Sequence, residues 1–593
     1  MEQKICQNCK SNFVVTDDDF GFYEKIQVPP PTWCPECRMQ RRLAFRNERA
    51  LYRKKSDATG KDIVSIFRPD SPMKVYEHEE FFSDTWDPLE YGTEYDFSKP
   101  FFQQFKELMV RTPTVALFDS KSTNSSYCNV TVEHKNCYLS SAAWGNEDCM
   151  YMNRTSHNKN SMDLYICGRN EFCYENVYCE DCSRVLYSHT TEQCNDSYFL
   201  YDCRGCSNCF GCWNLRNQKY CIFNQQYTKE QYLEKIKEFD LSNYDTVREI
   251  RRKVIDLRRG ALHRYAQIYQ STNAVGDHIH NVRNVYYCFD FLGGADNVKY
   301  SHWSTKQLKD SYDTGPGTGG NSELLYEGAS IGVQNARCMF GFIVWYSHDV
   351  QYGMNCHSSN NLFGCVSIRS KSYCILNKQY TKETYEGLVP KIIQHMNEMP
   401  YVDKKGRVYK YGEFFPTDIS PFPYNDTVAQ DYMPLTKEEA RARGYEWGEE
   451  SERNYKITKK TSELPGRIGD ISDDIVQDVI ECSHGGSCHD ECATAFRITP
   501  NELQFYRQLG IPLPRLCFNC RHWERLRQRN PLRLWHRQCQ CRPSEALAKE
   551  STHQNTSNHF HGDQPCPNEF ETSYAPDRPE IVYCETCYNA EVG

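Results

Sequence analysis

The chain has 593 residues and a formal net charge of −9, from 79 acidic and 70 basic side chains. A chain of this length exceeds what one hydrophobic core supports, so we expect three or more domains. Cysteine (32) and tyrosine (41) are abundant while the hydrophobic fraction is 39%, which indicates an interior of thiols and rings instead of leucine. The lack of any apolar run of about 18 residues, and of a signal-peptide core, argues against a membrane span or export and predicts a reducing, cytoplasmic compartment.

Residues 1–60 are predicted to form a zinc module followed by a basic helix. The pairs Cys6-x2-Cys9 and Cys34-x2-Cys37 supply four soft ligands at the spacing of a tetrahedral structural zinc site of treble-clef or ribbon type. The second pair stands at a helix start, where thiolates face the positive end of the helix dipole. Disulfides are the alternative, which a cytosolic chain disfavours.

A stripe of basic side chains follows Cys37, opposed by one acid, Glu48. Guanidinium forks pair with phosphate oxygens, so this stripe favours nucleic acid as a partner, with binding that weakens as salt rises. The alternative is that the arginines bind the chain's own acidic segments, such as 70–90 or 439–452. The arginines predicted to contact nucleic acid here are Arg38, Arg41, Arg42 and Arg46.

A short motif recurs between about 118 and 380, mostly every 10 to 14 residues. An Asn or Asp of turn character precedes a thiol or aliphatic next to an aromatic, as in Asn136-Cys137-Tyr138. Short strands at a fixed interval without intervening helices indicate a solenoid. We predict a mainly β fold whose centre is a tandem β-solenoid, best described as a parallel β-helix and flanked by zinc modules; an antiparallel array of hairpins is the alternative.

A longer period divides this centre in two. The stretch NCFGCWNLRNQKYCIFNQQYTKEQY from Asn208 recurs as NLFGCVSIRSKSYCILNKQYTKETY from Asn361, 153 residues later. The predicted segments are a connector with a helix over 61–117, a first solenoid over 118–227, a capping or linker helix over 228–270, a second solenoid over 271–380, and a helical tail with a proline-rich connector over 381–470.

Four closely spaced cysteines in the first solenoid imitate an iron–sulfur motif. In the internal copy Leu362 replaces Cys209 and Cys365 matches Cys212, so the fold accepts an aliphatic side chain where a cluster needs sulfur. We therefore expect buried free thiols that act as small apolar groups, with a metal site as the alternative. The four residues are Cys203, Cys206, Cys209 and Cys212.

Residues 482–538 repeat the N-terminal module. As in the first copy, 24 residues separate Cys492 from Cys517, and Cys520 completes the second pair. Thr499-Pro500-Asn501-Glu502 predicts a capped helix between them. The fourth ligand is open between Cys482, Cys488 and His489, with Cys488 favoured. The arginines predicted to contact nucleic acid after this pair are Arg521, Arg525, Arg527 and Arg529.

Residues 539–593 are predicted to form a C-terminal zinc ribbon. The pair Cys584-x2-Cys587 with Cys566 is its centre, completed by Cys541 or His561, with Cys541 favoured. Cys539 and His559 are the further candidates. The tail is poor in apolar residues and should not fold without metal, so the chain is expected to hold about three zinc ions.

The motifs CPECRMQRRLAFRNERALYRKK, YDCRGCSNCFGCWNLRN, LPRLCFNCRHWERLRQRNP and FETSYAPDRPEIVYCETCY resemble a cysteine-rich, zinc-ribbon-containing family of small-genome, candidate-phylum bacteria, over essentially the whole chain. The family has no established activity. Some members carry an automatic label as class III acyl-CoA transferases, an α/β class with a catalytic Asp that these β repeats do not support.

The leading functional hypothesis is a non-catalytic, zinc-dependent protein that binds nucleic acid, RNA favoured, or belongs to a ribonucleoprotein. One alternative is a zinc-stabilised protein–protein scaffold. Another is a β-helix carbohydrate-active enzyme, although acids in a repeat are usually turn residues, so no catalytic residue is assigned. The acids considered for that enzyme are Asp310, Asp313, Glu323 and Glu327.

Overall fold

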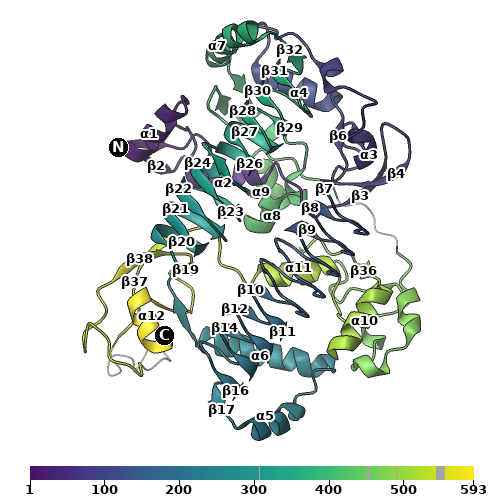
Figure 1. The fold of residues 1–593 in the computed structure, drawn as a ribbon, viewed down its shortest axis with the longest axis vertical. Coiled ribbons are helices and arrows are strands. Elements are labelled where there is room, and N and C mark those ends of the chain that lie inside the picture. Colours follow the sequence, from purple (N-terminus) through teal and green to yellow (C-terminus); the bar gives the residue numbers. More distant parts are fainter. Residues whose placement is uncertain (306, 319, 450–454, 489, 543–554) are drawn as a thin grey trace.

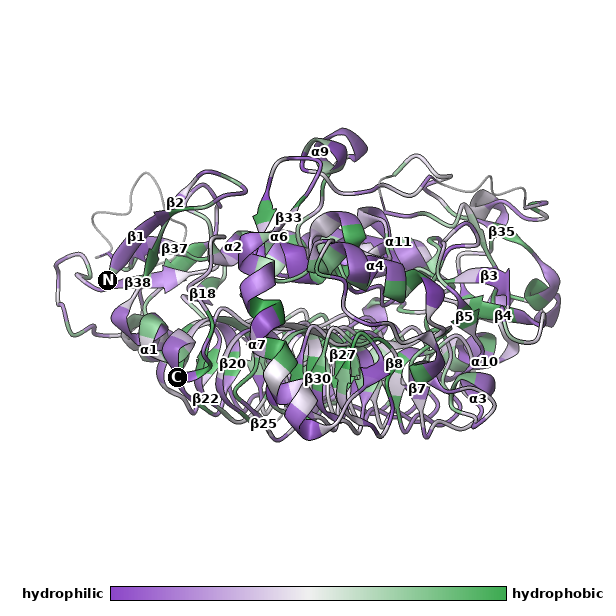
Figure 2. Cartoon of the chain, turned by 90° about the horizontal axis from the view of Figure 1, so that it is seen from above, coloured by the Kyte–Doolittle hydropathy of each residue, from purple (hydrophilic) through white to green (hydrophobic). Residues whose placement is uncertain are grey.

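The computed structural model describes residues 1–305, 307–318, 320–449, 455–488, 490–542 and 555–593. The chain is strand-rich with a centre dominated by sheet, which confirms the mainly β prediction. Two long runs of parallel strands form this centre, and most of the helices lie over one side of it (Figures 1 and 2).

The first run, here called the first ladder, extends from Asp119 to Ile222. Its residues pair in parallel with residues twelve positions later, as in Val177 with His189 and His189 with Tyr201. Isolated bridges continue the same register between the strands. The strands are β7 (Asp119–Ser120), β8 (Asn129–Val132), β9 (Ser141–Trp144), β10 (Val177–Glu180), β11 (Ser183–Leu186), β12 (His189–Glu192), β13 (Asn195–Tyr198), β14 (Tyr201–Arg204), β15 (Ser207–Phe210) and β16 (Lys219–Ile222).

Within each twelve-residue turn the backbone repeats every three residues. Asn136, Leu139 and Ala142 have φ of 54°, 48° and 51°, and left-handed residues recur at this spacing along the ladder. The Asn and Asp of the sequence motif often occupy these positions because their short polar side chains tolerate left-handed backbone. The residue after most of these corners is buried, as Cys137 and Ser140 are at 2% and 1% exposure.

This geometry explains the abundance of cysteine. A turn with four buried positions has room for small side chains, and thiols both fit and donate weak hydrogen bonds. Cys149 Sγ, for example, donates to the carbonyl oxygens of Glu147 at 3.2 Å and Asn158 at 3.4 Å. Burial raises the pKa of Cys149 well above its ordinary value, so this thiol stays protonated and acts as a small core group.

The second ladder extends from Ile268 to Ile375. Its parallel offsets vary, from eleven residues between Ile268 and Ile279 to fourteen between Leu308 and Ser322. Its strands are β19 (Ile268–Tyr269), β20 (Thr272–His280), β21 (Val282–Phe291), β22 (Ala295–Lys299), β23 (His302–Ser304), β24 (Leu308–Thr314), β25 (Ser322–Glu323), β26 (Tyr326–Val333), β27 (Ala336–Trp345), β28 (His348–Gln351), β29 (Met354–His357), β30 (Asn360–Phe363) and β31 (Ser372–Ile375).

Both ladders end in the same way, as the 153-residue repeat predicts. In each, the last parallel strand turns back in an antiparallel pair, and a helix follows whose first turn is capped by Thr228 or Thr381. The ending elements are β17 (Gln225–Gln226) with α5 (Lys229–Lys235), and β32 (Lys378–Gln379) with α7 (Lys382–Glu398).

The two ladders lie side by side and run in opposite directions (Figure 1). The ring of Tyr178 stacks on His278 with centroids 3.5 Å apart. Farther along, Trp144 meets Trp303 at 6.2 Å. Residue numbers therefore decrease along the second ladder in the direction in which they increase along the first.

The remaining elements surround this double ladder. Among the described residues, no helix is long and apolar enough to cross a bilayer. The helices are α1 (Asp17–Lys25), α2 (Pro35–Leu43), α3 (His78–Phe81), α4 (Phe101–Arg111), α6 (Tyr244–Arg259), α8 (Val428–Tyr432), α9 (Lys437–Ala442), α10 (Pro500–Leu509), α11 (Phe518–Leu526) and α12 (Glu585–Val592). Outside the ladders the paired strands are β1 (Glu2–Ile5) with β2 (Asn12–Val15), β3 (Tyr52–Lys55) with β4 (Asp62–Ser65), β5 (Val75–Tyr76) with β6 (Thr114–Val115), β18 (Leu262–Arg264) with β39 (Ile581–Tyr583), β33 (Tyr401–Val402) with β34 (Val408–Tyr409), β35 (Ile480–Glu481) with β36 (Ala495–Phe496), and β37 (Trp535–Gln538) with β38 (Glu569–Thr572).

Buried histidines should make the folded chain sensitive to acid. Burial lowers the pKa of His134, His263 and His302 to about 4, whereas an unfolded histidine binds its proton near pH ~6.5. The unfolded state therefore binds more protons than the folded state between these two pH values. Each histidine makes its whole contribution to the free energy of unfolding above pH ~6.5, and this contribution falls toward pH ~4 by up to about 3 kcal/mol per histidine.

The pH slope of urea unfolding, followed by tryptophan fluorescence, tests this expectation. His134→Gln should reduce the slope between pH 6.5 and 4 by up to about one proton. His348→Gln is the matched control, since the side chain of His348 is 52% exposed. Equal slopes in the wild type and His134→Gln would contradict the expectation.

Candidate metal centres

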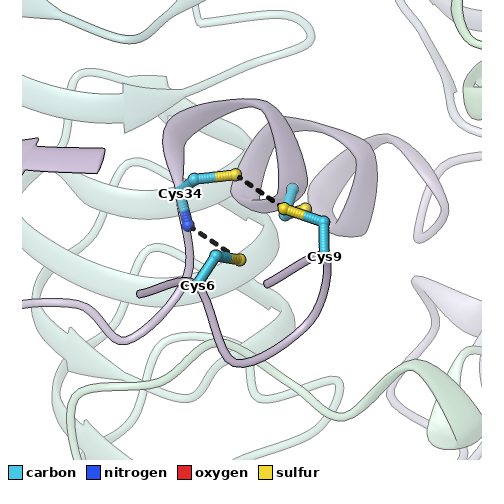
Figure 3. Close-up of side chains that lie close together, drawn as sticks. Cys6, Cys9 and Cys34 are labelled. Atoms are coloured by element: carbon cyan, nitrogen blue, oxygen red, sulfur yellow. Dashed lines mark hydrogen bonds between the residues drawn. The ribbon is translucent and has the colours of Figure 1, made fainter. Parts of the chain in front are cut away.

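Four cysteine sulfurs converge in the first module, which runs from β1 to α2. Cys6 follows β1 directly, Cys9 lies in the turn to β2, and Cys34 caps α2. The sulfurs of these three and of Cys37 lie within 4.8 Å of one another. Cys9 Sγ lies 3.7 Å from Cys34 Sγ, and the Cys34 N–H donates to Cys6 Sγ at 3.2 Å (Figure 3). The Cys34 thiol, with further hydrogen bonds, lowers the pKa of Cys6 far below its ordinary value, so this sulfur favours the thiolate form that a metal needs.

The second module, from β35 to α11, repeats this plan. Cys482 follows β35, Cys517 caps α11, and the Cys517 N–H donates to Cys482 Sγ at 3.3 Å. Cys492 and Cys520 complete the group of sulfurs within 4.8 Å. The predicted capping box at Thr499 is present at the start of α10.

The preference for Cys488 as fourth ligand is therefore corrected to Cys482. Cys482 occupies the place of Cys6 at the end of the first hairpin strand, but nine residues (483–491) separate it from Cys492, where two separate Cys6 from Cys9. Residue counting from the second ligand thus misplaces the first. Cys488 lies nearby, with its Sγ 3.7 Å from Cys520 Sγ, and residue 489 lies outside the described residues.

The third module, from β37 to α12, has the same plan again. Cys539 follows β37, Cys584 caps α12, and the Cys584 N–H donates to Cys539 Sγ at 3.1 Å. Cys566 Sγ lies 3.9 Å from Cys584 Sγ and 3.6 Å from Cys587 Sγ. The four-sulfur group therefore takes Cys539, which corrects the choice of Cys541.

The three modules are thus one design used three times. In each, the first cysteine ends a hairpin strand, and its sulfur accepts the N–H of the cysteine that caps the following helix. Four converging thiols at a helix N-terminus fit a soft divalent metal in tetrahedral geometry. In the structure a strand residue directly precedes Cys6, Cys482 and Cys539, so the hairpin strand, and not the residue spacing, marks the first cysteine of each module.

The basic helix of the first module faces the second ladder. Arg38 Nη2 pairs with Asp313 Oδ2 at 2.8 Å, and Arg42 Nη1 pairs with Asp313 Oδ1 at 3.0 Å. The three side chains are at most 2% exposed. Although burial opposes the charge, Asp313 raises the pKa of Arg38 well above its ordinary value, so the guanidinium is charged and neutralised internally.

Two further arginines of the first module, Arg41 on α2 and Arg46 just after its end, are equally enclosed. Arg41 pairs with Glu327 at 2.9 Å and with Glu413 at 3.0 Å. Arg46 pairs with Glu48 at 2.7 Å. All five side chains are at most 5% exposed. The first cysteine module is thereby tied to the second ladder and to the connector that contributes Glu413.

The basic helix of the second module faces the first ladder in the same manner. Arg521 Nε pairs with Asp163 Oδ2 at 2.9 Å, and Arg525 Nη1 with Asp163 Oδ1 at 2.8 Å. Asp163 has no exposed surface. Arg527 is exposed and pairs with Asp490.

These contacts place most of the arginines predicted to contact nucleic acid against carboxylates of the same chain, while nucleic-acid binding itself stays a prediction. Arg529 is partly buried, with its guanidinium 4.0 Å from the ring centre of Tyr432. The carboxylate partners lie outside both acidic segments, 70–90 and 439–452, that the alternative had named. The predicted contact residues that are buried are Arg38, Arg41, Arg42, Arg46, Arg521 and Arg525.

The four clustered cysteines of the first ladder line its interior and donate to backbone carbonyls. Cys203 Sγ lies 3.4 Å from the Tyr201 oxygen, and Cys206 Sγ lies 3.3 Å from the Arg204 oxygen. All four are at most 1% exposed and belong to one apolar cluster. Among the described residues, the groups of sulfur and other donor atoms that converge within 4.8 Å do not include them.

The acids considered for an enzyme lie in different surroundings. Asp313 and Glu327 form buried ion pairs with Arg42 and Arg41. Asp310 pairs with Lys25 at 3.0 Å, and Glu323 lies exposed on β25.

Comparison with known proteins adds little to this geometry. No family model and no curated protein matches the chain. A solved structure from Desulfovibrio desulfuricans G20, provisionally titled an acetyltransferase, aligns with 49% of this chain and 86% of that chain at 10% identity and a TM-score of 0.10. A TM-score this low carries no argument, so the resemblance to the cysteine-rich family stays a prediction.

Proposed function

We propose that the chain is a non-catalytic scaffold in which zinc modules lock two β-solenoids together. The observation that carries this proposal is the burial of the module arginines against ladder carboxylates, such as Arg42 with Asp313 and Arg521 with Asp163. Charged groups removed from water are costly unless paired. The paired arginines therefore orient each module on its ladder, and little of the module's positive charge is left to bind a phosphate backbone.

The proposed metal is zinc, about three ions per chain. All-thiolate sets with tetrahedral geometry favour zinc or an iron–sulfur centre. Each group is closed by four protein sulfurs, which is the arrangement of a structural site, since a catalytic zinc keeps one position open.

The ladders are proposed to be parallel β-helices. The twelve-residue register of the first ladder, its left-handed corner at every third residue and its buried small side chains support a regular coil. Such coils are stiff because each turn hydrogen-bonds to the next along its length. Two of them, clamped in opposite directions, make a rigid platform for a protein partner.

Crosslinking in cells, followed by purification under denaturing conditions, tests the proposal. The scaffold predicts a reproducible protein partner, and purified protein that retains no RNA or DNA in a filter-binding assay at low salt. Arg527→Glu, at an exposed arginine, should change neither result. Retention of RNA that falls with this substitution would overturn the scaffold in favour of nucleic-acid binding.

A further inference from the structure

A second group of metal-ligand atoms adjoins the four-sulfur group of the third module. Donor atoms of Cys541, His559, His561 and Cys587 lie within 4.8 Å of one another. Cys541 Sγ is 3.5 Å from His559 Nδ1, and Cys587 Sγ is 3.4 Å from His561 Nε2. Cys587 thus belongs to both groups, and its sulfur stands between them.

The two imidazoles are held as metal-binding histidines usually are. His559 Nε2 lies 2.8 Å from Glu591 Oε1, with both side chains at most 3% exposed. His561 Nδ1 lies 2.6 Å from the Gln564 carbonyl oxygen. Because a carboxylate and a carbonyl only accept, each histidine donates its N–H outward. The lone pairs of His559 Nδ1 and His561 Nε2 therefore face the sulfurs.

Further hydrogen bonds prepare both sides of this arrangement. The backbone N–H groups of Thr556 and Ser557 donate to the Glu591 carboxylate at 2.9 and 3.1 Å, which fixes its position. Asn555 Nδ2 donates to Cys541 Sγ at 3.2 Å, a contact that favours a thiolate. Outer groups of this kind orient ligands and raise their basicity.

We propose that the third module binds two metal ions, with the Cys587 thiolate bridging them. The second ion is a zinc-class divalent cation held by Cys541, His559, His561 and the bridging Cys587. Its binding displaces the proton of the Cys541 thiol to solvent, because each imidazole binds through the nitrogen that carries no proton and Cys587 is already a ligand in the first site. The chain then holds one ion beyond its three four-sulfur groups.

This inference goes beyond the proposed function but rests on metal loading of the four-sulfur group that shares Cys587. It also explains the surplus of ligands in the tail. Cys539 and Cys541 lie two residues apart, just after β37, and their sulfurs belong to different groups of donor atoms. They serve two different ions instead of competing for one place.

Metal analysis of the full-length protein tests the second ion. His559→Gln with His561→Gln should lower the metal content by one ion per chain, and Glu591→Gln should weaken that ion's affinity about 10- to 100-fold. His536→Gln is the matched control, because this histidine of the same module is 62% exposed. Unchanged metal content in the double variant would overturn the second ion.

The wild-type protein loaded with cadmium-113 provides a readout independent of variant folding. The bridge predicts two cadmium resonances with mutual scalar coupling, one from an all-sulfur site and one from a mixed sulfur–nitrogen site. All-sulfur resonances alone would overturn the second ion while leaving the three four-sulfur sites intact. Absence of any bound metal would instead remove the proposed function and this inference together.

Discussion

Replacing Asp163 by asparagine is expected to weaken the attachment of the second metal module by roughly 3–5 kcal/mol. Asp163 is fully buried and is the shared counter-charge of Arg521 and Arg525. An amide would leave two buried guanidinium groups without the carboxylate that they share. The backbone should not respond, because Asp163 has a left-handed φ of 57° that asparagine also tolerates.

Hydrogen exchange of the backbone amides in α11 measures this effect. Protection should fall roughly 10²- to 5 × 10³-fold in Asp163→Asn if local opening governs exchange, while metal content stays constant. Asp196→Asn is the matched control: Asp196 also occupies a left-handed corner of the first ladder, at φ 46°, but pairs with Arg184 at the surface. Such a pair contributes at most about 1 kcal/mol. Equal protection in both variants would show that Asp163 does not hold the helix.

Removing the sulfur of Cys482 is expected to cost the chain one metal ion and to unfold the second module. Structural zinc contributes an apparent binding free energy on the order of 10 kcal/mol to small modules. Cys482 is fully buried, and its Sγ lies 3.8 Å from Cys520 Sγ. Since Cys488 Sγ lies 3.7 Å from the same sulfur, Cys482→Ser should also be combined with Cys488→Ser to prevent exchange of ligands.

Metal content and limited proteolysis report the outcome. The double variant should lose one ion and become cleaved within α10 and α11, whereas Cys488→Ser alone should keep the wild-type metal content and resistance. Loss of metal in Cys488→Ser with retention in Cys482→Ser would return the fourth ligand to the residue that counting along the sequence favours.

Much of the local structure was predictable from the sequence. The cysteine pairs at helix starts, the capping box at Thr499 and the repeat of the ladder ending all lie where spacing places them. These features depend on neighbours within a few residues, or on a repeat that the chain displays directly. Local hydrogen bonds and dipoles are therefore encoded by spacing.

The first ligand of the second and third modules was not predictable in this way. Cys482 and Cys539 are defined by hairpin strands whose partners lie across loops of different length. A β-hairpin can accommodate a loop insertion at little entropic cost, so ligand spacing changes while ligand position in space does not. Residue spacing describes the order of cysteines along the chain, whereas a metal site is defined by which sulfurs lie close together in space.

The sequence by itself determined that sulfur groups organise both ends of this chain and that a short repeat fills its centre. Only the tertiary structure decided what the arginines do. Asp163 and Arg521 are 358 residues apart, and Arg42 and Asp313 are 271 apart, so no spacing rule connects them. A basic stripe has the same pattern whether it faces phosphate or a buried carboxylate. The surface packed against the helix determines which of the two the arginines contact, because a charge removed from water needs an opposite charge within the fold.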